Sequence, residues 1–424
     1  MSKFWLRLDN AALIFPAVKR PGWCNVFRQS VSLREDIDPA LLQEAANDLK
    51  PRFPSLYVRL RTGIFWYYLE EIRGPLTVGQ DFAYPLTHMA TKELHTCCLR
   101  ILYYRNRIAV EFFHALTDGT GGMIFLKTLA ARYIALKYGI DIPASDGILD
   151  IGQQPQPEEI EDSFLRYSGQ HAMSRSEPNS YRLKGTHEKD GVRHLITGVL
   201  PTDKLVEVAH SYHATVTVFL VAVMAQVITE MQAKHAPNRR PKPVKITVPV
   251  NLRRLYGSKT LRNFVLTLNP GVDPQLGAFT LDDLCNGISA QLSAEAMPQI
   301  MAARIAANVI PQQLAILRIM PLFIKNLFLR MVYAYVGETK GCLNISNLGV
   351  VKLPEPMRPY VERMEFIIGV QYTYPNNCSV VSLGNATYVN MIRNIRETEL
   401  EQRFFSRLVE LGVPVTIESK LRGD

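Results

Sequence analysis

The chain lacks the short motifs of several common enzyme classes. It contains no GxSxG segment, no GxxxxGK[ST] phosphate loop and no strand followed by GxGxxG. These absences disfavour serine hydrolases, NTPases and nucleotide-dependent dehydrogenases. Six cysteines occur without any CxxC pair, so neither a zinc site nor a disulfide framework is indicated. The apolar run at residues 11–15 is too short for a signal-peptide core. We therefore expect an unexported, cytoplasmic protein in a reducing compartment.

Composition describes an ordinary globular protein with a basic excess. The 424 residues are 47% hydrophobic, which excludes disorder as the main state and favours two domains of roughly 200 residues each. The net charge of +9 makes a polyanionic partner plausible, whether nucleotide phosphates, nucleic acid or anionic lipid. Basic residues are scattered and no nucleic-acid reader motif accompanies them, so a nucleic-acid partner is disfavoured.

Two apolar segments deserve comparison with membrane helices. Residues 214–229 fall short of a span and carry four polar side chains, which favours a helix in the protein core. Residues 317–336 form a basic amphipathic pattern interrupted by Pro321. That segment fits a helix packed on the core with solvated basic residues, a membrane-docking helix or the wall of an apolar channel, and the first is favoured. No stable membrane insertion is expected.

The order of predicted elements is mixed α/β with largely antiparallel strands. An acidic, proline-containing stretch at 141–162 divides the chain, giving an N-terminal subdomain at 1–140, a crossover linker at 141–190 and a C-terminal subdomain at 191–424. No internal repeat is visible. Strands are expected at 4–8, 26–33, 56–71, 94–113, 194–200, 244–250, 263–268, 342–345, 364–374, 378–383 and 386–393, and helices at 39–49, 123–138, 203–233, 281–294, 299–310, 315–336 and 397–411.

One segment, residues 111–122, combines groups that suit proton transfer. An apolar strand delivers His114, Asp118 follows four positions later, and a glycine cluster precedes a helix. Histidine titrates near neutrality and suits removal of a proton from a hydroxyl or amine that attacks a carbonyl. Asp118 either orients the imidazole or pins the loop to a basic residue. Metal binding is disfavoured because no third ligand sits nearby, and a purely structural histidine is the other alternative.

His114, Asp118 and Gly119 form HxxxDG, which resembles the active-site motif of the chloramphenicol acetyltransferase-like superfamily of CoA-dependent acyltransferases. Two further segments agree with this resemblance in order and spacing: residues 248–264 look like the second-domain strand and loop with Asn-x-Arg, and residues 344–349 look like the Ser-Asn-Leu-Gly segment of alcohol acetyltransferases. The resemblance implies an α/β fold of two subdomains. Each would hold a mixed, mostly antiparallel sheet flanked by helices, with an active-site tunnel at their interface.

The resemblance also implies roles for individual residues. His114 would be the general base, Asp118 a structural carboxylate, and Arg253 its salt-bridge partner. Gly119 would permit the tight turn that presents the histidine. A further set would lie near the channel, where a hydroxyl or amide donates to the oxyanion of the tetrahedral intermediate: Asn263, Ser346 and Asn347.

Departures from the family pattern narrow the branch. Phe113 stands at the place of the first histidine in the HHxxxDG form of condensation domains, and no DFGWG segment occurs. Alcohol O-acetyltransferases or polyketide-associated acyltransferases therefore fit best. The expected activity is therefore transfer of an acyl group, most simply acetyl, from acyl-CoA to a hydroxyl in a ternary complex. No permanently bound cofactor is expected, and a monomer is the default. The alternatives are a donor on an acyl carrier protein, an amine acceptor, or a catalytically silent ligand-binding protein.

Overall fold

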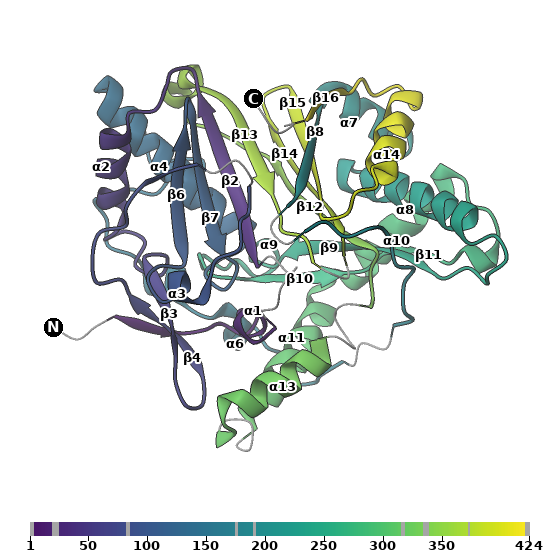
Figure 1. Cartoon of the computed structure of the whole chain (residues 1–424), viewed down its shortest axis with the longest axis horizontal. Coiled ribbons are helices and arrows are strands. Elements are labelled where there is room, and N and C mark those ends of the chain that lie inside the picture. The colour runs from purple at the N-terminus through teal and green to yellow at the C-terminus, as the bar shows by residue number, and fades with distance from the viewer. Residues whose placement is uncertain are drawn as a thin grey trace.

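The computed structural model describes residues 4–18, 25–81, 85–173, 177–189, 192–314, 319–333, 339–371 and 374–419. Two large sheets stand side by side, and a small sheet lies below the first one (Figure 1). Most strand pairs are antiparallel; the parallel pairs among the described strands are β5 with β6 and β12 with β9 and β14. This mixed, largely antiparallel α/β architecture confirms the predicted fold class.

The first large sheet belongs mainly to the N-terminal half. Its strand order is β13 (Val361–Ile367), β2 (Val26–Leu33), β7 (Arg107–Phe113), β6 (Leu99–Tyr104) and β5 (Gly79–Gln80). Helix α4 (Gly119–Tyr138) packs on it, and α2 (Pro39–Leu49) packs against α4 (Figure 1). Helix α2 begins at the predicted residue because the Asp38 carboxylate accepts hydrogen bonds from the first backbone amides. Gly139, at φ 64°, ends α4 as predicted.

The second large sheet belongs to the C-terminal half. Its strands, in order, are β10 (Val265–Leu268), β9 (Val244–Asn251), β12 (Leu343–Val350), β14 (Asn376–Leu383), β15 (Ala386–Arg393), β8 (His194–Pro201) and β16 (Thr416–Ser419), with β11 (Gly271–Val272) paired to β9. Its helices are α7 (Thr202–Ser211), α8 (Val216–His235), α10 (Leu281–Glu295) and α14 (Glu399–Glu410). Helix α8 is long and apolar enough to cross a membrane, but 67% of its most apolar window is buried. The predicted core helix is thus confirmed.

Shorter elements complete the chain. The small sheet has the order β1 (Trp5–Arg7), β4 (Tyr67–Glu71) and β3 (Val58–Thr62). The remaining helices are α1 (Ile14–Ala17), α3 (Thr91–Leu94), α5 (Pro157–Ile160), α6 (Ser163–Arg166), α9 (Arg253–Tyr256), α11 (Pro298–Gln313) and α13 (Leu322–Val332), with 3₁₀ turns η1 (Pro274–Leu276) and η3 (Glu355–Tyr360).

Strand β13 joins the two sheets. It pairs along its length with β2 of the first sheet, although it lies far along the chain in the C-terminal half. The Phe366 carbonyl also accepts hydrogen bonds from Ser379 Oγ (2.6 Å) and Asn390 Nδ2 (3.1 Å) of the second sheet. Strand β13 therefore pairs within the first sheet and also contacts the second one. The domain boundaries near 140 and 190 stay a prediction.

Several local predictions are wrong. The strand expected over 56–71 is divided into β3 and β4, and the one expected over 364–374 ends at Ile367. The helix expected over 203–233 is divided into α7 and α8, because His213 adopts a positive φ of 52° and Thr215 starts a new helix by accepting a hydrogen bond from the Val218 amide. The glycine cluster at 119–122 does not precede α4 but forms its first turn. The helix expected at 315–336 appears as α13, and residues 315–318 and 334–336 of that prediction lie outside the described residues.

Candidate active site

His114 lies immediately after β7, where the first sheet meets a loop of the C-terminal half. Its backbone amide donates to the Asn25 carbonyl (2.8 Å), and its own carbonyl accepts from Asn263 Nδ2 (3.1 Å). Asn25 in turn donates from Nδ2 to the Phe15 carbonyl (2.8 Å). Hydrogen bonds to the backbone on both sides therefore fix the histidine between segments that are distant in sequence.

Aromatic rings surround the imidazole of His114. Phe15 stacks on it with ring centroids 4.5 Å apart and an interplanar angle of 11°, and Phe27 meets it edge-on at 5.0 Å. Burial lowers the pKa of His114, opposed by its own carbonyl and by the Asp118 carboxylate. The imidazole is therefore uncharged at neutral pH, which is the state a general base requires.

The two ring nitrogens of His114 differ in access. Nδ1 is shielded from solvent and has no hydrogen-bond partner among the described residues. Nε2 is not fully shielded from solvent. A neutral imidazole carries one N–H and one free lone pair. The arrangement leaves Nε2 as the nitrogen that a small molecule can reach.

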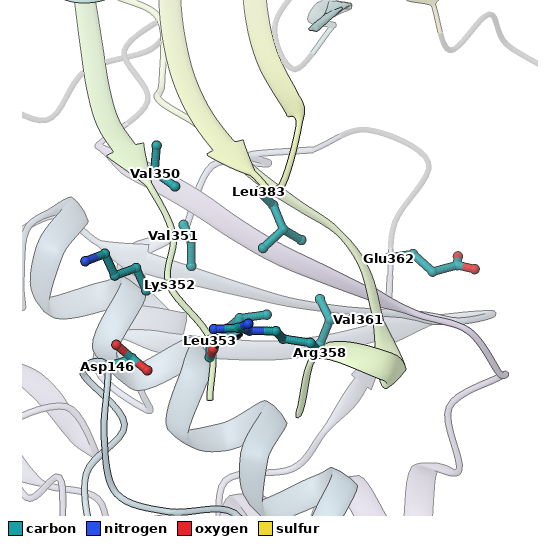
Figure 2. Close-up of a pocket in the computed structure, with 10 residues that line it drawn as sticks. Asp146, Val350, Val351, Lys352, Leu353, Arg358, Val361, Glu362 and Leu383 are labelled. Atoms are coloured by element: carbon teal, nitrogen blue, oxygen red, sulfur yellow. Dashed lines mark hydrogen bonds between the residues drawn. The ribbon is translucent and has the colours of Figure 1, made fainter. Parts of the chain in front are cut away.

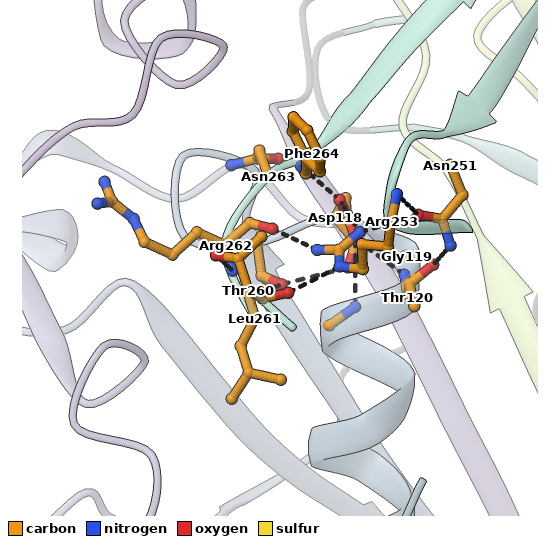
Figure 3. Close-up of polar contacts among 12 residues, drawn as sticks. Asp118, Gly119, Thr120, Asn251, Arg253, Thr260, Leu261, Arg262, Asn263 and Phe264 are labelled. Atoms are coloured by element: carbon orange, nitrogen blue, oxygen red, sulfur yellow. Dashed lines mark hydrogen bonds and ion pairs between the residues drawn. The ribbon is translucent and has the colours of Figure 1, made fainter. Parts of the chain in front are cut away.

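The Asp118 carboxylate lies in a polar network with Arg253, the start of α4 and the Phe264 backbone (Figure 3). Oδ1 caps α4 by accepting from the amides of Thr120 (3.1 Å) and Gly121 (3.2 Å). Oδ2 accepts from Arg253 Nη1 (2.8 Å) and from the Phe264 amide (2.8 Å). Of the two roles left open by the sequence, this geometry matches the carboxylate that pins the loop.

Arg253 forms hydrogen bonds to three segments: the Asp118 loop, Asn251 and the loop at 260–262 (Figure 3). Besides Asp118, its guanidinium donates to the Thr260 carbonyl (2.7 Å), to Asn251 Oδ1 (3.3 Å) and to the Arg262 carbonyl. The side chains of the ion pair are only 9% and 4% exposed. A planar fork that satisfies a carboxylate and two carbonyls fixes direction as well as charge.

Asn251 adds a second bridge between the halves. Its Nδ2 donates to Thr120 Oγ1 (3.0 Å) in the first turn of α4, and its Oδ1 accepts from the Arg253 amide (3.1 Å). The Asn-x-Arg segment thus holds the beginning of the helix that follows His114.

The glycines of α4 serve close packing. A Cβ on Gly119 would lie 2.8 Å from Leu348 Cδ2, and one on Gly121 would lie 2.3 Å from the Leu261 carbonyl oxygen. Neither glycine has a positive φ, so the backbone at Gly119 does not require glycine for the expected tight turn. Helix α4 reaches β12 and the Leu261 loop because these positions lack side chains.

Asn263 and Asp9 form a polar contact behind His114 that the motif did not indicate. Asn263 Nδ2 donates to Asp9 Oδ2 (3.3 Å) as well as to the His114 carbonyl. Asp9 is fully buried, accepts from the Ala12 amide (2.7 Å) and lies 3.6 Å from Arg262 Nε. Burial raises the pKa of Asp9 to about 7, opposed by Arg262. Asp9 and Phe15 were missed because they come from the N-terminal segment, about a hundred positions from the motif, with no spacing signal to connect them.

The other two predicted channel residues lie on β12. The Asn347 side chain is occupied, since Nδ2 donates to Thr217 Oγ1 (3.0 Å) and Oδ1 accepts from the Gly349 amide (2.8 Å). The Ser346 hydroxyl has no hydrogen-bond partner within the described part of the chain. Ser346 alternates with buried Ile345 and lies two residues before Leu348, which contacts Gly119. Their role at an oxyanion stays a prediction.

One cavity of the described structure has a lining that does not include His114 (Figure 2). It has a volume of about 730 Å³ and lies between the end of β12, η3 and the β14–β15 turn. Its lining includes Val351, Lys352, Arg358 and Leu383 but neither His114 nor Asp118. A tunnel that reaches the histidine from both faces therefore stays a prediction.

Other chemistries find little support among the described residues. No group of three or more His, Cys, Asp or Glu side chains is placed to hold a metal ion. The five described cysteines are free, and burial raises the pKa of Cys97 to about 11. A thiol with such a pKa is protonated at neutral pH and a poor nucleophile.

Comparison with solved structures finds the same architecture in several proteins. Polyketide synthase associated protein 5 from Mycobacterium tuberculosis superposes with a TM-score of 0.61 and 16% identity, covering 95% of this chain and 96% of that one. A trichothecene 15-O-acetyltransferase from Fusarium sporotrichioides has a TM-score of 0.61 and 12% identity, with coverage of 96% and 94%. TRI101 of F. graminearum, solved with ethyl coenzyme A, has a TM-score of 0.63 and 10% identity, with coverage of 99% and 100%.

Neither protein-family models nor curated protein sequences gave a match. At sequence identities of 10–16% these similarities establish a common fold. Because nearly the whole of each chain is covered, the similarity includes both large sheets. The chain therefore shares the two-subdomain fold of these solved proteins, which confirms the fold that the HxxxDG resemblance implied.

Proposed function

We propose that the protein is an acyl-CoA-dependent O-acyltransferase with His114 as its general base. The observation that carries this proposal is the state of the histidine: it is half-buried and uncharged, fixed at the backbone, and keeps Nε2 as its less shielded nitrogen. The fold supports the reaction class, because structural neighbours include a 15-O-acetyltransferase and a protein that binds ethyl coenzyme A.

In the proposed reaction His114 Nε2 takes the proton of the acceptor hydroxyl as the oxygen attacks the thioester carbonyl. The new C–O bond gives a tetrahedral oxyanion, to which the free Ser346 hydroxyl is the candidate donor. Collapse breaks the C–S bond, and the departing thiolate takes the proton from the imidazolium. The ester and CoA thiol leave, and the histidine is neutral again.

Asp118 and Arg253 act in this scheme without touching substrate. Their ion pair fixes the helix that begins five residues after the base, and Asn263 fixes the base's own carbonyl. Because the Asp118 oxygens are fully engaged elsewhere, the carboxylate takes no proton from His114. These two residues are therefore positioning residues.

The test is thiol release from acetyl-CoA with a panel of alcohols and amines. Release should require an acceptor and fall by about 10²-fold or more in His114→Ala. His210→Ala, at an exposed position on α7, is the matched control and should keep the wild-type rate. An active His114→Ala protein would overturn the mechanism. Activity only with an acylated carrier protein would replace the proposed donor and leave the base in place.

A further inference from the structure

Helix α13 exposes several large apolar side chains to solvent, while polar side chains of the same helix form hydrogen bonds to the protein. Phe323, Leu327 and Met331 are 75%, 60% and 58% exposed. They lie at i, i+4 and i+8 and form one stripe. This orientation reverses the favoured sequence interpretation, in which the apolar side would pack on the core.

The polar residues of α13 attach the helix to the body of the protein. Lys325 Nζ donates to the Phe65 carbonyl (2.8 Å) and Asn326 Nδ2 to the Tyr67 hydroxyl (2.8 Å). Arg330 Nε donates to the Ala17 carbonyl at the end of α1 (2.7 Å). These three bonds fix the rotation of the helix, so the outward apolar stripe is a built feature of the surface.

The β3–β4 hairpin extends the apolar surface. Ile64 and Trp66 at its tip are 76% and 43% exposed, and the Ile64 carbonyl accepts from the Leu322 amide at the start of α13 (2.9 Å). In Figure 1 the hairpin and α13 project from the same side of the molecule. We call this surface the apolar face; its members are Ile64, Trp66, Phe323, Leu327, Phe328 and Met331.

Charge in the segment that contains α13 has one sign, whereas strand β4 of the hairpin carries Glu70 and Glu71. No Asp or Glu occurs between Glu295 and Glu338, while Lys325 and Arg330 lie within that interval. Across the hairpin, Arg7 lies over the Trp66 ring with Cζ 5.5 Å from its centroid. An exposed apolar stripe bordered by basic groups complements the surface of an anionic bilayer.

We propose that the apolar face binds the surface of an anionic phospholipid membrane. Five of its six side chains have no hydrogen-bonding group with which to specify a protein partner, and the sixth, Trp66, has the apolar ring and polar N–H suited to the headgroup region. Because the basic groups lie at the level of the protein body, the stripe enters the acyl boundary while Lys and Arg remain among the headgroups. Binding is peripheral and involves no membrane-spanning segment.

The test is co-sedimentation of the full chain with vesicles of phosphatidylcholine alone or mixed with phosphatidylglycerol. We expect the protein to pellet with the mixed vesicles, less with phosphatidylcholine alone, and less again in high salt. Phe323→Ser combined with Leu327→Ser should reduce the bound fraction by about tenfold or more. Leu276→Ser combined with Val409→Ser changes equally exposed residues on other elements (80% and 54% exposed) and should bind as wild type.

Two outcomes would overturn the proposal. One is a wild-type chain that stays in the supernatant with both kinds of vesicle. The other is a Phe323→Ser, Leu327→Ser protein that pellets like wild type. Should the chain sediment as a dimer that the double substitution converts to monomer, with no vesicle binding, the face is a contact between two copies instead. Trp66 becomes the single tryptophan when Trp5 and Trp23 are replaced by Phe. Quenching of its fluorescence by lipids brominated on their acyl chains then measures insertion without altering the apolar face and independently of acyl transfer.

Discussion

Replacing Arg253 by Met tests whether the ion pair with Asp118 holds the site together. The substitution keeps an unbranched apolar stem and removes the guanidinium that binds the Asp118 carboxylate and the carbonyls of Thr260 and Arg262. Both side chains are nearly inaccessible. Removing one partner of a buried pair leaves an uncompensated charge and costs about 3–5 kcal/mol.

The assay is thermal unfolding beside a matched control. About 2–4 °C is lost per kcal/mol in a unit of 150–250 residues, so Arg253→Met should lower the melting temperature by roughly 6 to 20 °C. Lys204→Met removes a cation from an exposed pair with Glu207, whose side chains are 52% and 67% exposed, and should shift it by no more than about 2 °C.

A second variant separates the ion pair from the helix cap. Asp118→Asn retains an oxygen for the Thr120 and Gly121 amides while removing the charge. Combined with Arg253→Met it should cost less than the sum of the two single changes, because the buried charge is then gone. If Arg253→Met melts within about 2 °C of Lys204→Met, the reasoning about the buried pair is refuted.

Three other consequences can be measured directly. Because burial lowers the pKa of His114 below its ordinary 6.5, the neutral base persists into mild acid; the acid limb of kcat/KM should have its midpoint below pH 6.5, and a midpoint above that value would contradict the assignment. Gly119→Ala places a Cβ 2.8 Å from Leu348 Cδ2, so it should lower the free energy of unfolding by about 1–3 kcal/mol, measured by thermal unfolding. Adding Leu348→Ala should restore much of this loss, and no restoration would argue against the contact. In the folded protein Asp9 has a pKa near 7, whereas in the unfolded chain its carboxyl loses its proton near pH 3.8, so its contribution to the free energy of unfolding falls as the pH rises between these values. Asp9→Asn should reduce the pH dependence of the free energy of unfolding measured in urea titrations. An unchanged pH dependence would exclude this contribution of Asp9.

Local signals in the sequence predicted many elements well. Strand β2 and helix α2 have the predicted bounds, the latter because Asp38 is an N-cap followed by Pro39. The division between α7 and α8 escaped prediction because no Gly or Pro marks it; the one available signal was Thr215 as an N-cap. Strand β16 was not predicted at all, and it is short and exposed along its length.

Of the candidate site, the sequence predicted the residues that belong to local motifs and missed the contacts that depend on tertiary structure. His114 and Asp118 follow from the motif, and Arg253 follows from the family resemblance, since it was the one expected partner of the carboxylate. The contact of Asp9 with Asn263 depends on how the N-terminal segment folds across the C-terminal half, which no local pattern encodes. The orientation of α13 escaped for a related reason: amphipathic spacing defines two faces, but tertiary contacts such as that of Arg330 with Ala17 decide which one faces water.

The residues that fix His114 come from opposite ends of the chain, and this has a consequence during synthesis. A nascent chain that has emerged only as far as α4 carries the base but lacks Asn251, Arg253 and Asn263, and strand β13, which completes the first sheet, emerges later still. The arrangement around His114 is therefore complete only after nearly the whole polypeptide has left the ribosome and both halves have docked. The proposed turnover would then report on completed folding, and complementing fragments divided in the linker would regain it only by reassembling that junction.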